Sequence, residues 1–166
     1  VRAILGQQTS VKAARTLVMR FVSAFGESID TPFQELTRTF PAPETICGLA
    51  PPVEDQLGPL GITGARARSI FSLAEALVQG HINLSPRVAN PAAEMEKLLK
   101  MPGFGHWTVQ YLAMRVLAWP DAFPHTDHGV KKTLPGLDAT DILRLSEAWR
   151  PWRAYATLAL WNSLGA

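Results

Sequence analysis

Residues suited to binding an anion are concentrated in the segment Leu98–Thr108. A helix-like run ends at Pro102 and Gly103, and a second helix-like run begins directly after Gly105. Glycine has no Cβ, so the backbone can turn tightly there and approach a partner closely. The first amides of a helix have no intrahelical acceptor, and together with the helix dipole they form an anion site. The spacing predicts a helix-hairpin-helix over about residues 91–118 whose turn binds a phosphate.

Asp127 is the candidate for electrostatic or acid–base chemistry. It lies in the proline-containing loop Phe123–Lys132, just before a predicted helix. An ionised carboxylate can stabilise a positive charge that develops in a reaction, and it can orient or deprotonate an attacking water. An aspartate before a helix is also a typical N-cap. The two roles are compatible, and the local sequence leaves both open.

Three aromatic residues could form a binding pocket. Trp107 and Tyr111 lie one helical turn apart, and Trp161 lies on the last predicted helix. The face of such a ring attracts a cationic ligand by about 0.5–2 kcal/mol. Aromatic residues at helical spacing are equally typical of a hydrophobic core. Without further information, both interpretations stand.

The elements that must position these residues are predicted to be helices throughout. No segment alternates with the period of a strand. Ser10, Thr63 and Asn90 are expected to cap the helices that begin near them. The expected helices are 11–25, 44–49, 53–57, 62–78, 91–100, 107–118, 128–134, one from a cap at Asp138 or Thr140 to Ala148, and 151–164. The sequence therefore predicts an all-α fold.

Four motifs in order resemble the helix-hairpin-helix, Gly/Pro-rich-loop, aspartate (HhH-GPD) DNA glycosylases. They are Val1–Ser10, the hairpin turn, the Asp127 loop and Trp149–Ala156. The two terminal motifs are similar to those of the AlkA-like 3-methyladenine DNA glycosylase II branch. The resemblance implies one catalytic core over residues 1–166, built from two interleaved helical subdomains with a cleft between them. The small sheet-containing domain that precedes this core in AlkA-like proteins is expected to be absent.

The resemblance implies a base excision repair enzyme that hydrolyses the N-glycosidic bond of alkylated purines, such as 3-methyladenine and 7-methylguanine. Its partner would be duplex DNA from which the damaged base is flipped out. Asp127 would be the catalytic carboxylate, and Trp107, Tyr111 and Trp161 would bind the base. Bifunctional members carry a nucleophilic lysine at the position of Trp107. We therefore expect a monofunctional glycosylase without lyase activity.

The hairpin is expected to hold the DNA backbone. The resemblance implies that Gly103, Gly105 and Thr108 point backbone amides at phosphate oxygens, contacts that position the duplex without selecting sequence. It also implies a structural Na⁺ or K⁺ held by the backbone carbonyls of Leu99, Met101 and Gly103. No other cofactor is expected.

Gln8 is the candidate for filling the gap left by the flipped base. A well-known relative has leucine at this position of the first motif. A polar side chain there could hydrogen-bond to the orphaned base. The alternative interpretation of Gln8 is a residue that ends a helix.

Two other functions stay open. One is a glycosylase for a different lesion, such as uracil or an oxidised or mismatched base. Neutral bases would be expected to need specific hydrogen-bonding side chains, and the candidate pocket is mainly aromatic. The other is a non-catalytic DNA-binding module. Asp127 together with the tryptophans argues against it, because a pure binder needs neither.

The composition limits cofactors and location. The 166 residues are 47% hydrophobic and 18% charged, which is typical of a folded domain. Cys47 is the single cysteine, so four thiolates for an iron–sulfur cluster are lacking. His106, His125 and His128 fit no usual zinc spacing. The net charge of +2 is modest, so DNA affinity would come from a local basic surface. We expect a monomer in the bacterial cytoplasm, associated with the nucleoid and not with a membrane.

Overall fold

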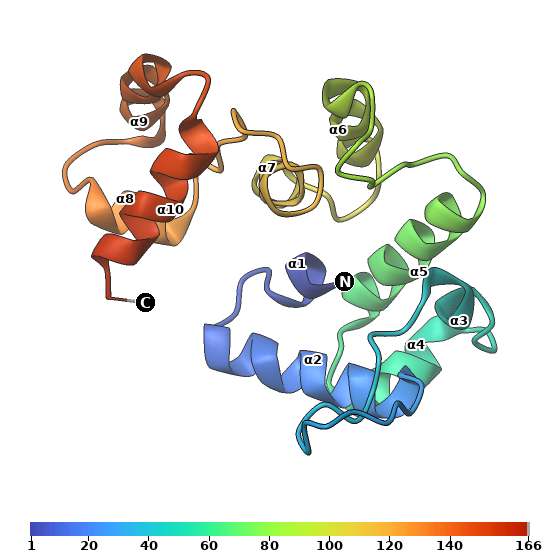
Figure 1. Ribbon diagram of the computed structural model, residues 1–166. Coiled ribbons are helices and arrows are strands. Elements are labelled where there is room, and N and C mark those ends of the chain that lie inside the picture. Colours follow the sequence, from blue (N-terminus) through green and yellow to red (C-terminus); the bar gives the residue numbers. More distant parts are fainter. Residues whose placement is uncertain (166) are drawn as a thin grey trace. The chain divides into compact units, whose positions relative to one another are not determined.

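The computed structural model describes residues 1–165, and the regular elements in that range are helices joined by loops (Figure 1). The nearest approach to a sheet within it is an isolated antiparallel bridge between Ser28 and Arg38. The all-α prediction is therefore confirmed. Among the described residues, no helix is both long and apolar enough to span a bilayer. The predicted domain ends at Ala166, which lies outside the described residues.

The chain divides into two compact units that are interleaved in sequence. The N-terminal unit comprises Val1–Ile82 and the three residues Met101–Gly103. The C-terminal unit comprises Asn83–Lys100 and the chain from Phe104 onward. The two helices of the hairpin thus belong to one unit, and the middle of the turn between them belongs to the other.

The N-terminal unit is built around α5, against which α1, α3 and α4 pack. Phe21 of α2 and Leu57 of α4 are fully buried in this unit. The elements are α1 (Arg2–Leu5), α2 (Val11–Phe25), α3 (Pro43–Cys47), α4 (Val53–Leu57), the short 3-10 helix η1 (Gly58–Leu60) and α5 (Gly64–Val78). The Ser10 hydroxyl accepts a hydrogen bond from the amide of Ala13, so the predicted N-cap of α2 is confirmed. Thr63 precedes α5, but its side chain makes no capping bond, and that detail of the prediction was wrong.

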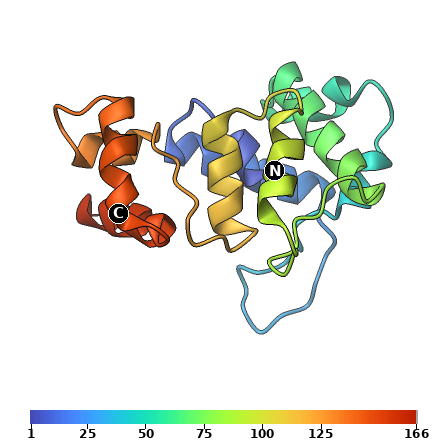
Figure 2. The same cartoon turned by 90° about the horizontal axis from the view of Figure 1, so that it is seen from above.

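The C-terminal unit pairs α6 with α7 and α8 with α10, and the latter two lie side by side in both Figure 1 and Figure 2. Phe123, Val130 and Ile142 form a buried cluster in this unit. The elements are α6 (Pro91–Leu99), α7 (His106–Arg115), α8 (His128–Thr133), α9 (Ala139–Ser146), the 3-10 helix η2 (Glu147–Trp149) and α10 (Arg153–Ser163). The side chains of Asn90 and Asp138 cap α6 and α9, as the sequence predicted.

Several helix boundaries differ from the prediction by one or more residues, and two of these differences have a visible cause. The second hairpin helix ends at Arg115 and does not reach Ala118, because Ala118 has a positive φ of 54° and turns the chain away. The last helix begins at Arg153 and not at Pro151. The amide of Ala154, in its first turn, donates to the carbonyl of Pro120, so a contact distant in sequence sets this start.

A buried ion pair fastens α10 to the loop before α8. Arg153 donates from Nε to Oδ1 of Asp121 at 2.6 Å and from Nη2 to Oδ2 at 2.8 Å. Both side chains are only 9% exposed. Arg150 adds a further contact to Oδ2 of Asp121. The arrangement is bidentate and shielded from water, so each partner depends on the other.

We expect Asp121→Asn to lower the free energy of unfolding by about 3–5 kcal/mol, because the buried Arg153 guanidinium loses its bidentate carboxylate partner and keeps only the 3.2 Å contact from Nη1 to Glu147. Urea unfolding followed by circular dichroism measures this change. Asp141→Asn is the matched control, since Asp141 pairs with Arg144 at the surface, with 43% and 76% of the two side chains exposed. The control should cost at most about 1 kcal/mol. Equal losses in the two variants would contradict the structural role of Asp121.

Candidate active site

Asp127 is the N-cap of α8, which confirms the capping interpretation. Its Oδ1 accepts hydrogen bonds from the amide of Gly129 at 2.8 Å and from the amide of Val130 at 3.2 Å. These two amides have no intrahelical acceptor of their own. The carboxylate is therefore fixed at the positive end of a helix.

Two indole groups also donate to the Asp127 carboxylate. Nε1 of Trp107, in α7, lies 2.8 Å from Oδ2, and Nε1 of Trp161, in α10, lies 2.8 Å from Oδ1. Three elements of the C-terminal unit thus orient one half-buried carboxyl group. Among the described contacts Oδ1 accepts three hydrogen bonds and Oδ2 accepts one. Each carboxylate oxygen offers about two acceptor positions, so Oδ2, with one bond, retains the capacity to face a water or a developing positive charge.

The three predicted aromatic residues form one cluster beside this carboxylate. Trp107 stacks on Tyr111 with ring centroids 5.3 Å apart and an interplanar angle of 19°. Tyr111 lies 6.3 Å from Trp161 at a tilt of 40°. The prediction that these three residues lie close together is confirmed. It did not reveal that the indole edges bind Asp127 or that Tyr111 covers one face of Trp107.

Arg115 is a member of this cluster that sequence analysis missed. Its guanidinium carbon lies 6.0 Å from the centroid of Tyr111 and 5.6 Å from that of Trp161. Both distances suit a cation–π contact. A permanently charged group therefore already lies against two of the three rings.

Gly129 is the second residue that sequence analysis missed. A Cβ at this position would lie 2.8 Å from Cδ1 of Trp161 and 3.0 Å from both its Nε1 and Oδ1 of Asp127. The indole of Trp161 can approach the carboxylate only because that space is empty. A signal was present in the sequence, since a glycine inside a predicted helix costs helix stability and often has a packing reason.

The hairpin turn is fastened within the N-terminal unit. Gly103 has a φ of +84°, a conformation that favours glycine, and a Cβ there would collide with Oγ of Ser69. The hydroxyl of Ser69 donates to the carbonyl of Pro102 at 3.0 Å, and Nε2 of Gln7 donates to the carbonyl of Gly103 at 2.9 Å. The turn is therefore held rigidly, as a phosphate-binding loop requires.

The remaining hairpin predictions concern backbone groups. Gly105 is the N-cap of α7, and Thr108 lies in its first turn with a buried side chain, so a contact from Thr108 to phosphate would involve its backbone. The carbonyl of Gly103 already accepts one hydrogen bond from Gln7, which leaves one lone pair for a cation. Phosphate binding by these amides and cation binding by Leu99, Met101 and Gly103 stay predictions.

Gln8 lies in the turn between α1 and α2 and belongs to neither helix, so the alternative of a helix-end residue is wrong. It is exposed and has a φ of +48°, which is uncommon for a residue other than glycine. Such strained positions are often found at functional sites. The role of Gln8 beside a flipped base stays a prediction.

The histidines near Asp127 are not gathered into a possible metal-binding group in the part of the chain that the structure describes. No group of three or more potential metal ligands is assembled among the described residues. Burial lowers the pKa of His125. Electrostatic interactions with His106, Lys131 and Arg153 lower this pKa further, whereas a hydrogen bond with the backbone of Phe123 raises it. The His125 imidazole is therefore neutral at physiological pH.

Comparison with known proteins places this fold in a defined class. A solved structure of 3-methyladenine DNA glycosylase from Schizosaccharomyces pombe, in complex with abasic DNA, matches with a TM-score of 0.79 and 26% identity, over 99% of this chain and 78% of that one. A 3-methyladenine DNA glycosylase from Archaeoglobus fulgidus has the same fold, with a TM-score of 0.78 and 20% identity over 96% of this chain and 55% of that one.

The chain belongs to the HhH-GPD superfamily of base excision DNA repair proteins, whose family model matches residues 1–153. It is 36% identical over 166 residues to DNA-3-methyladenine glycosylase 2 of Escherichia coli. The aligned region is 99% of this chain and 56% of that protein. It is 38% identical over 168 residues to a probable bifunctional transcriptional activator/DNA repair enzyme AlkA of Mycobacterium tuberculosis, over 99% of this chain and 32% of that protein. The chain thus spans about a third to a half of the length of these relatives.

Proposed function

We propose that this chain is the catalytic core of a monofunctional DNA glycosylase that hydrolyses the N-glycosidic bond of alkylated purines in duplex DNA. The observation that carries the proposal is the Asp127 carboxylate, oriented by the indole N–H groups of Trp107 and Trp161 at the edge of an aromatic cluster. The homologous 3-methyladenine glycosylases support the choice of substrate class.

The geometry suits a dissociative hydrolysis. The bond between C1′ and the base nitrogen breaks, and its electron pair leaves with the base. Positive charge develops on the sugar, where the Asp127 carboxylate stabilises it. A water then bonds to C1′ and loses a proton, which Oδ2 is free to accept. The products are the free base and a DNA strand with an abasic deoxyribose.

The aromatic cluster explains a preference for cationic bases. A purine alkylated on a ring nitrogen carries a positive charge, so it is attracted to an indole face by about 0.5–2 kcal/mol more than the normal base is. It is also a good leaving group without prior protonation, which is why a single carboxylate suffices. Because Arg115 lies against Tyr111 and Trp161, we assign stacking of the base to Trp107.

The proposal is tested by incubating the chain with duplexes that carry 3-methyladenine or 7-methylguanine and measuring the free base by chromatography. Parallel duplexes with uracil or 8-oxoguanine serve as neutral-lesion controls. We expect release of the alkylated bases and no release of the neutral ones. Release of a neutral base alone would favour a different glycosylase, and no release would favour a DNA-binding module.

We expect no covalent enzyme–DNA adduct when borohydride is added during the reaction. A Schiff base requires an amine at the reacting carbon, and Trp107 stands where bifunctional relatives have their lysine. The abasic strand should stay intact until alkali is added. An adduct on a denaturing gel, or strand cleavage before alkali, would contradict the monofunctional mechanism.

A further inference from the structure

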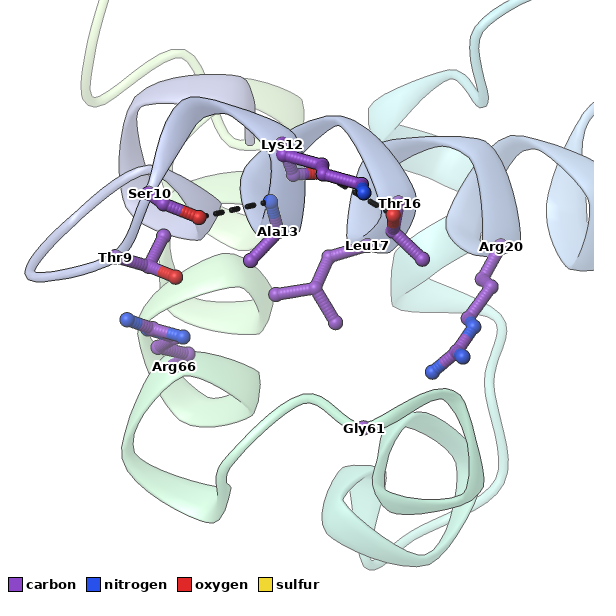
Figure 3. A pocket seen from close by; sticks show the side chains of 9 residues that line it. All are labelled: Thr9, Ser10, Lys12, Ala13, Thr16, Leu17, Arg20, Gly61 and Arg66. Carbon is purple, nitrogen blue, oxygen red and sulfur yellow. Dashed lines mark hydrogen bonds between the residues drawn. The ribbon is translucent and has the colours of Figure 1, made fainter.

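A pocket of about 520 Å³ lies beneath α2, entirely within the N-terminal unit (Figure 3). None of the residues that surround Asp127 contributes to it. The lining residues are Thr9, Ser10, Lys12, Ala13, Thr16, Leu17, Arg20, Gly61 and Arg66. Its composition is that of a site for an anion with an apolar part.

The pocket is lined by three basic side chains and by no acidic one. Arg20 and Arg66 enter it from opposite sides, with Leu17 between them (Figure 3). Arg66 donates from Nη2 to the carbonyl of Gln7, and Arg20 donates from Nη1 to the carbonyl of Leu60 at 3.2 Å. Each guanidinium is therefore anchored by one nitrogen. Since a guanidinium has five donors, the others can bind a ligand.

The size and the remaining lining residues indicate more than a bare phosphate. A volume of about 520 Å³ accommodates a phosphodiester together with a sugar. Ala13 and Leu17 supply apolar surface for the sugar. Thr9, Ser10 and Thr16 add hydroxyl groups to the lining. Cationic groups bind the phosphates of a nucleic acid backbone, and a small apolar surface beside them can contact the sugar.

Hydrogen bonds connect this pocket to the hairpin turn. Arg66, which lines the pocket, binds the carbonyl of Gln7, and the side chain of Gln7 binds the carbonyl of Gly103. Gln8, the residue predicted to fill the gap beside a flipped base, lies between Gln7 and the pocket residue Thr9. The pocket, the turn and this loop are thus parts of one connected surface of the N-terminal unit.

We propose that this pocket binds a backbone phosphate and its deoxyribose from the duplex, as an anchoring point for DNA additional to the hairpin. The proposal rests on the proposed function, because it takes duplex DNA as the ligand. Lys12, Arg20 and Arg66 neutralise the phosphate, and the pocket reads no base. Its contribution is therefore independent of sequence and sensitive to salt.

The first test places a negative charge in the pocket without weakening α2. Ala13 is exposed and lies three residues after the N-cap Ser10, the position at which Glu or Gln completes a capping box. Ala13→Glu should raise the Kd for an undamaged duplex about tenfold at moderate salt, as measured by fluorescence anisotropy. Ala13→Gln completes the same capping box without charge, and its Kd should stay within about twofold of the wild type. Equal affinities of the two variants would overturn the proposal.

The second test removes single positive charges from one helix. Lys12 and Arg15 are both exposed on α2, but only Lys12 lines the pocket. Lys12→Gln should lower the slope of log Kd against log salt by about one, the loss of one phosphate contact, and Arg15→Gln should leave the slope unchanged. Equal changes in both variants would show an effect of net charge alone and overturn the proposal.

The two proposals fail in different ways. If the wild-type chain neither binds duplex DNA nor releases alkylated bases, the proposed function is wrong. If the wild type binds DNA and releases bases while Ala13→Glu binds as tightly as Ala13→Gln, only the pocket proposal is wrong.

Discussion

Asp127→Asn is expected to slow the release of 7-methylguanine from duplex DNA by about 10²–10³-fold under single-turnover conditions. The substitution removes the negative charge that stabilises the sugar cation. It also disturbs the hydrogen bonds that orient the side chain at position 127. If the amide oxygen keeps the three donors at Oδ1, the amide nitrogen replaces Oδ2 and faces the N–H of Trp107, which is itself a donor. The hydrogen bond to Trp107 is then lost.

Asp138→Asn is the matched control for this prediction. Asp138 caps α9 as Asp127 caps α8, with Oδ1 accepting from the amides of Thr140 and Asp141, both at 2.8 Å. Asparagine is as good an N-cap as aspartate, so both variants should fold. The control should release base at the wild-type rate. Equal rates for the two variants would show that Asp127 only caps its helix.

Gly129→Ala is expected to lower the rate of base release by about 100-fold, because the new methyl group must displace the indole of Trp161 or the carboxylate of Asp127. Alanine favours a helix over glycine by up to about 1 kcal/mol, so a loss cannot come from helix propensity. Release of 7-methylguanine measures the change in activity. Tryptophan fluorescence should report the altered surroundings of Trp161.

Gly58→Ala is the control for the steric argument. Gly58 also has helical backbone angles, but a Cβ there would meet nothing within 4 Å. This variant should keep its activity and stability. Retention of full activity in Gly129→Ala would show that the close approach of Trp161 to Asp127 is not needed for catalysis.

Local sequence signals predicted the elements well where the signal and its effect are close together. Ser10, Asn90 and Asp138 cap helices whose first amides lie two or three residues further on. Boundaries set by distant contacts were missed. The start of α10 depends on a bond from Ala154 to Pro120, which no local pattern contains.

The same distinction applies to the candidate site. The family motifs indicated that Asp127, Trp107 and Trp161 belong together, and the structure places them in contact. Residue types could not show which part of each ring meets the carboxylate, because that depends on how three helices pack. Arg115 was missed for this reason, since an arginine late in a helix is usually interpreted as favourable to the helix dipole.

The assignment of Met101–Gly103 to the N-terminal unit has a consequence for the dissection of this chain. A fragment truncated after Ile82 would lose the carbonyls of Pro102 and Gly103, to which Ser69 and Gln7 donate. A fragment that starts at Asn83 would carry these three residues away from the surface that holds them. We therefore expect residues 1–82 to be less stable as a separate fragment than within the full chain, because Ser69 and Gln7 lose these acceptors.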